Sequence, residues 1–181
     1  MKPVRAKTVW FKKQAPRSAK ELASVLASTL WRLADKLVDN LSRSDYDIVT
    51  PARGYGIIAE VLALGLHLCD RWAYGRLDDA RRGALVQAIG AHLADTMENN
   101  VRGTRADFID MLNRRGADYA SFDIPSSGAG FPVLRYLGAQ IREAMEEHDQ
   151  HWVMDQVMDV EMPEVLGTLK KTFDGLLAQA G

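Results

Sequence analysis

The sequence predicts an all-α protein, a single-domain bundle of five to six helices. Almost every segment after residue 17 spaces its apolar side chains three or four positions apart, the period of an amphipathic helix. Strand signals are nearly absent, since the one short candidate, KTVWFKK at 7–13, alternates poorly. The 181 residues are 47% hydrophobic and 26% charged, which is typical of one globular domain.

The first helix is expected to begin at a capping box, in which Ser18 and Glu21 each satisfy a backbone N–H of the first turn. Six leucines behind it share one face of the helix: Leu22, Leu26, Leu30, Leu33, Leu37 and Leu41. A second helix should begin at Thr50 and Pro51, a cap residue followed by a proline at the first helical position, and run to about Gly75.

Four further helices follow from apolar spacing and from cap residues. We expect them from about Leu77 to Glu98, from Thr104 to near Gly116, from just after Pro132 to about Asp159, and from about Met162 onward.

Two helices carry more apolar surface than a bundle member needs. The second is apolar almost all round, which predicts a central position in the fold. The first has another stripe, about 180° from the leucines, formed by Ala27, Trp31, Ala34 and Val38. Either this helix packs on two sides within the monomer, or the stripe is an interface to a second copy or another protein.

Charge is unevenly distributed, although the net charge is −1. The first twenty residues contain seven basic side chains and no acidic one, which leaves 16 bases against 24 acids in the remainder. We expect residues 1–17 to form a basic arm outside a helical domain of residues 18–181. The arm could be a solvated tail, or could bind the acidic body, a sister subunit, an anionic membrane or nucleic acid. The acidic body argues against nucleic acid, for which Trp10 and Phe11 would be the stacking groups.

Cysteine content and hydropathy favour a cytoplasmic protein, and the general composition resembles that of bacterial cytoplasmic proteins. Cys69 is the single cysteine, so no internal disulfide can form and a reducing compartment is expected. The longest charge-free apolar run in the most hydrophobic region is Val61 to Cys69, well short of the ~20 residues of a membrane span. The N-terminus has no apolar segment typical of a secretory signal.

Histidines on apolar helix faces suggest a metal site. In the expected fifth helix His148 and Asp155 point inward with His151 at the edge, and His92 lies on the apolar face of the third helix. Imidazole and carboxylate ligands suit Zn, Fe or Mn, so a divalent metal is possible at His92, His148, His151 and Asp155, with Asp95 or Glu60 as further candidates. The alternative is that each inward histidine is neutral and hydrogen-bonded. No other cofactor is predicted.

Two further polar groups are candidates for binding. On the second helix one polar strip is either the solvent-facing line of a buried helix or one wall of a cleft: Glu60, His67, Arg71 and Tyr74. The connector at 122–132 could hold an anion on backbone N–H groups at the start of a helix, with Ser126, Ser127, Gly128 and Gly130 nearest. No Walker pattern accompanies it, so a plain connector is the alternative.

These observations favour a protein that works through protein–protein contacts, as an adaptor, assembly factor or regulator, and as a homodimer. No catalytic triad follows from the spacing, which favours a non-enzymatic role over an enzymatic one. A metal-binding helical protein or metal-dependent hydrolase is one alternative, and nucleic-acid binding through the basic arm is another.

Overall fold

The computed structural model describes residues 18–48, 50–125 and 128–178. These residues form an all-α bundle without a β-strand, which confirms the predicted fold class. The helices are α1 (Ala19–Arg43), α2 (Pro51–Ala73), α3 (Asp79–Asn100), α4 (Arg105–Ala120), α5 (Phe131–Glu143), α6 (Val153–Asp155), the π-helix η1 (Gln156–Glu161) and α7 (Met162–Ala178). The basic arm and the strand candidate at 7–13 lie outside the described residues.

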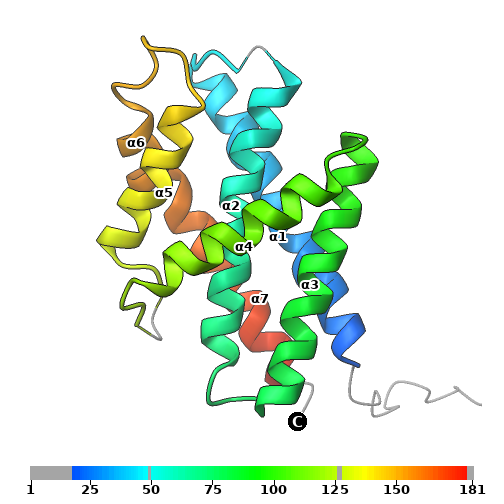
Figure 1. Cartoon of the computed structure of the whole chain (residues 1–181). Coiled ribbons are helices and arrows are strands. Elements are labelled where there is room, and N and C mark those ends of the chain that lie inside the picture. Colours follow the sequence, from blue (N-terminus) through cyan, green and yellow to red (C-terminus); the bar gives the residue numbers. More distant parts are fainter. Residues whose placement is uncertain (1–17, 49, 126–127, 179–181) are drawn as a thin grey trace, which may run out of the picture.

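α2 is the central helix, as its apolar sequence predicts. It contacts α1, α3, α4, α5 and α7. In Figure 1, α4 runs obliquely across α2 and α3, while α5 and α6 stand together on one side of α2. A hollow lies between α2, α3 and α4, and side chains of α4 contact α5.

α2 is also long enough and apolar enough to cross a membrane by length and composition, which the nine-residue run at 61–69 did not suggest. The mean hydropathy of an 18-residue window stays high even though it includes charged residues of the kind that bound the nine-residue run. Half of that window is buried inside the bundle. A core helix of a soluble protein passes the same test, and the contacts of α2 with five other helices are those of a core helix.

α1 begins as predicted. The Ser18 hydroxyl accepts a hydrogen bond from the Glu21 N–H at 3.2 Å, and the Glu21 carboxylate accepts one from the Ser18 N–H at 2.8 Å. Five of the six leucines are fully buried and Leu33 is partly buried. Leu30 packs so closely on α2 that a Cβ added to Gly65 would collide with it.

The second apolar stripe of α1 is largely used within the monomer. Ala27 and Ala34 have no exposed surface, because α1 contacts α2, α3 and α7 at once. Trp31 and Val38 are partly buried, and the Trp31 indole lies 6.5 Å from the Tyr55 ring. At Ala27 and Ala34 the stripe therefore packs within the monomer, which is the first of the two alternatives.

The predicted continuous helix from Pro132 to Asp159 is wrong. α5 ends at Glu143, and a turn-rich segment precedes α6 and η1. No glycine or proline marks this break. Tertiary contacts hold it instead: the Asp149 carboxylate accepts a hydrogen bond from the Asp47 N–H at 2.6 Å, and Glu146 pairs with Arg53 of α2. Such contacts override the helical preference of the sequence.

α4 is longer than predicted, whereas the helix that begins at α5 is shorter than predicted. It continues past Gly116 to Ala120, because Tyr119 is fully buried and packs against the rings of His67 and Tyr136. Burial of a large aromatic side chain offsets the cost of about 1 kcal/mol of a helical glycine.

Candidate functional sites

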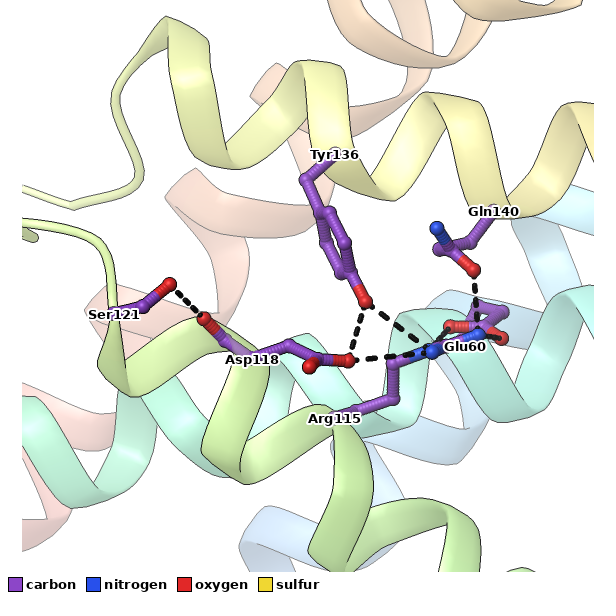
Figure 2. Close-up of polar contacts among 6 residues, drawn as sticks. All are labelled: Glu60, Arg115, Asp118, Ser121, Tyr136 and Gln140. Atoms are coloured by element: carbon purple, nitrogen blue, oxygen red, sulfur yellow. Dashed lines mark hydrogen bonds and ion pairs between the residues drawn. The ribbon is translucent and has the colours of Figure 1, made fainter.

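The main polar cluster of the bundle lies where α2, α4 and α5 meet, around Arg115 of α4 (Figure 2). Arg115 Nε and Nη2 both donate to the Glu60 carboxylate at 2.7 Å, and Nη2 also donates to Gln140 at 2.6 Å. Nη1 donates to the Tyr136 hydroxyl at 3.2 Å and to Asp118 at 3.4 Å. Tyr136 in turn donates its proton to Asp118.

This arrangement, which we call the Arg115 clamp, uses every N–H of the guanidinium. A guanidinium has five N–H donors, and five hydrogen bonds leave from Arg115. The hydrogen bonds to Glu60 raise the pKa of Arg115. Burial, and then the hydrogen bond to Asp118, raise the pKa of Tyr136 to about 12. With no donor left for a ligand, the clamp fastens three helices together.

A row of aromatic rings leads from the clamp toward α3. Tyr136 meets Tyr119 edge to face at 5.3 Å, and Tyr119 lies 5.8 Å from the His67 imidazole. Burial raises the pKa of Tyr119, whose hydroxyl makes no hydrogen bond within the described part of the chain. The row connects Glu60 and His67, seven residues apart on α2, through side chains of α4 and α5.

The polar strip expected on α2 is divided among different environments. Glu60 belongs to the clamp, whereas His67 lines a hollow of about 450 Å³ between α2, α3 and α4. Arg71 and Tyr74 are exposed, and the Tyr74 ring lies 5.7 Å from the guanidinium of Arg71 and 5.2 Å from that of Arg82. The strip is therefore a cleft wall at His67 and solvent-facing at its C-terminal end.

The four residues proposed as metal ligands do not form a cluster. His151 and Asp155 line one hollow beside α5, but His148 is exposed and His92 belongs to α3. His148 was expected inward because the helix was expected to continue; the break after Glu143 turns it outward and buries the neighbouring Asp149 instead. Among the described residues no group of three or more His, Cys, Asp or Glu side chains could hold a metal ion.

The anion site expected in the connector can be described only in part, since Ser126 and Ser127 fall outside the described residues. Gly130 is the N-cap of α5 and offers no side chain to it. Gly128 has a φ of 133°, a backbone conformation that favours glycine.

An exposed aromatic face that the sequence pattern does not predict lies between α5 and η1. It surrounds a hollow of about 390 Å³ that is lined by two arginines, one carboxylate and several apolar groups. Phe131 and Trp152 are 65% and 66% exposed, the two largest such fractions among the exposed large hydrophobic residues. We call this region the α5–η1 face, defined by Trp152, whose ring lies 5.7 Å from that of His151, and by the hollow-lining residues Phe131, Arg135, Arg142, His151, Met154, Asp155 and Met158. Only the break after Glu143 brings its two halves together.

A buried carboxylate lies at the end of η1. Glu161 is 6% exposed and accepts hydrogen bonds from the side-chain amides of Asn40 at 2.7 Å and Gln156 at 3.1 Å. The Asn40 amide joins η1 to α1, whereas Gln156 belongs to η1 itself. π-Helical turns are frequently found at functional sites, and this one borders the α5–η1 face.

Comparison with protein-family models, with curated proteins and with solved structures finds no match to this chain.

Proposed function

We propose that this protein acts through protein–protein contacts, as a homodimeric adaptor, assembly factor or regulator, and that the α5–η1 face is the contact. The observation that carries the proposal is the exposure of two large aromatic side chains at one hollow. Phe131 lines the hollow, and the Trp152 ring lies 5.7 Å from the ring of His151, which also lines it. Large aromatic side chains left in water are characteristic of interaction sites, and Trp, Phe, Met and Arg are enriched in interface cores.

Charge favours a second copy of the chain as the partner. Arg135 and Arg142 form no ion pair with a described residue, and neither does Asp155 in the same hollow. A two-fold contact lays one surface on itself, so charged groups within it can pair only if that surface carries both signs. The α5–η1 face carries both signs, and none of these three charges is paired within the described part of the chain.

A cytoplasmic location belongs to the same proposal. Cys69 is fully buried, and burial raises the pKa of its thiol to about 12, so it remains an unreactive thiol. A chain with one inert thiol and no disulfide requires no oxidising compartment.

Trp152→Asp tests the contact. A central tryptophan contributes about 2 kcal/mol or more to an interface, so the dissociation constant should rise at least about 30-fold. Sedimentation velocity over a wide range of protein concentration measures this directly. Tyr74→Asp is the matched control, because Tyr74 is 62% exposed but lies at the end of α2. A wild-type chain that stays monomeric at every concentration would refute the dimer.

Arg142→Glu tests the electrostatic part of the contact. Association should weaken, and the loss should shrink as salt is added, because screening reduces repulsion between like charges. Arg114→Glu on α4 is the control, since Arg114 is also exposed but does not belong to the face. Equal effects from both variants would argue against the α5–η1 face.

A further inference from the structure

We propose that the hollow between α2, α3 and α4 binds a neutral, largely apolar small molecule that carries one hydrogen-bonding group. The hollow measures about 450 Å³, within the roughly 300–1,000 Å³ of small-molecule sites. The hollow and the α5–η1 face lie on different helices, so each proposal can be tested independently of the other.

Small side chains create the space. Ala63, Gly90 and Gly116 line the hollow, and a Cβ added to Gly116 would meet no atom within 4 Å. Leu66, Ile109 and Leu112 provide apolar walls. A glycine within a helix costs about 1 kcal/mol relative to alanine, so α4 gives up stability where it borders this space.

The charged groups at the hollow are already neutralised by the protein's own side chains. The Asp70 carboxylate accepts a hydrogen bond from Arg82 at 2.6 Å, and Arg105 pairs with Asp95. A charged ligand would lose hydration here without gaining a counter-ion. The remaining polar lining is uncharged, which selects for a neutral molecule.

His67 supplies the polar contact. Its imidazole is partly buried, packs on Tyr119, and makes no hydrogen bond to any residue that the structure describes. Burial lowers the pKa of His67, an effect that the Asp70 carboxylate opposes and Arg71 reinforces. The ring is therefore neutral at pH 7, with one nitrogen that donates and one that accepts. A ligand hydroxyl or N–H can pair with either.

A pair of fluorescent probes tests the ligand class. N-phenyl-1-naphthylamine is neutral and has one N–H, whereas 1-anilinonaphthalene-8-sulfonate has the same rings with a negative charge. Fluorescence titration of the full chain should show saturable one-to-one binding of the neutral probe, with at least about tenfold weaker binding of the sulfonate. Equal affinities, or no saturable binding of the neutral probe, would overturn the proposal.

Variants that fill the hollow locate the binding. Gly116→Leu should weaken the neutral probe by about tenfold or more, while the helix itself gains propensity. Gly175→Leu is the control, since Gly175 is exposed on α7 and a Cβ there also meets nothing within 4 Å. Ala91→Leu fills the same hollow from α3. If Gly116→Leu fails to fold, the affinity of Ala91→Leu for the neutral probe tests the site instead. Unchanged affinity in the folded variant would refute the site.

His67→Phe separates the polar contact from the space. It retains an aromatic ring beside Tyr119 but removes both nitrogens, so the neutral probe should bind about fivefold less tightly. Full retention of affinity would overturn the role of His67. If a second copy of the chain fills the hollow instead, probe binding will weaken as protein concentration rises, and the small-molecule proposal fails.

Discussion

Glu60 and His67 lie seven residues apart on α2 and have opposite environments. Glu60 receives two hydrogen bonds from Arg115, and the surrounding donors are all used. His67, at the other end of the same aromatic row, makes ring contact but no hydrogen bond within the described residues. The sequence presents the two as members of one polar strip, and the tertiary structure separates them.

The difference indicates which polar groups are available for binding. A polar group whose partners all come from the protein adds rigidity and specificity to the fold. A partly buried polar group without a partner retains the capacity to bind a ligand. The clamp therefore explains how α4 and α5 are held on α2, and the hollow at His67 is where a ligand can enter.

The largest effect is expected at the clamp. Arg115→Met leaves the Glu60 carboxylate without its counter-charge, and the two side chains are only 20% and 14% exposed. We expect a loss of about 3 kcal/mol in the free energy of unfolding, measured by urea denaturation. Glu60→Gln combined with Arg115→Met should lose less, because a neutral amide then replaces the buried Glu60 carboxylate. A single variant as stable as wild type would show that water replaces the guanidinium.

A smaller loss is expected from Tyr136→Phe. The variant keeps the ring contacts with Tyr119 and Phe122 but removes the hydroxyl that joins Arg115 to Asp118. The free energy of unfolding should fall by about 1 kcal/mol. In Tyr74→Phe an exposed hydroxyl is lost and no change is expected. If Tyr136→Phe and Tyr74→Phe are equally stable, the Tyr136 hydroxyl does not contribute to the stability of the clamp.

At the hollow between α2, α3 and α4, a substitution is expected to stabilise the protein. Gly116→Ala should raise the free energy of unfolding by about 0.5–1 kcal/mol, because alanine favours the helix and its methyl group meets free space. The same variant should bind the neutral probe less tightly. Gly175→Ala should gain similar stability without a change in probe affinity. A stabilised Gly116→Ala with unaltered binding would separate the glycine from the ligand.

The smallest effect concerns pH. Because burial lowers the pKa of folded His67 below 6.5, the unfolded chain takes up the proton first as pH falls. Above pH 6.5 the imidazole is neutral in both states, and its contribution to stability is fully present. Below pH 6.5 that contribution is lost progressively toward the folded pKa. Urea denaturation above and below pH 6.5 should show a steeper decline for wild type than for His67→Phe; parallel declines would contradict the assignment.

The sequence alone determined where most helices begin. Ser18 with Glu21, and Thr50 with Pro51, are local signals, since each cap is completed within three residues. The leucine face of α1 and the apolar surface of α2 likewise depend only on helical period. These features place α2 at the centre of the fold without reference to any distant residue.

Only the tertiary structure decided the sites. Arg115 reaches Glu60 across 55 positions of sequence, and Asp149 reaches the Asp47 N–H across 102. No local pattern encodes such pairings, because they depend on the angle at which α4 crosses α2 and on the break after Glu143. That break turned His148 outward and created the α5–η1 face, whereas the crossing left His67 beside open space. Caps and periodicity act within a few residues, but hollows and interfaces form where distant helices meet.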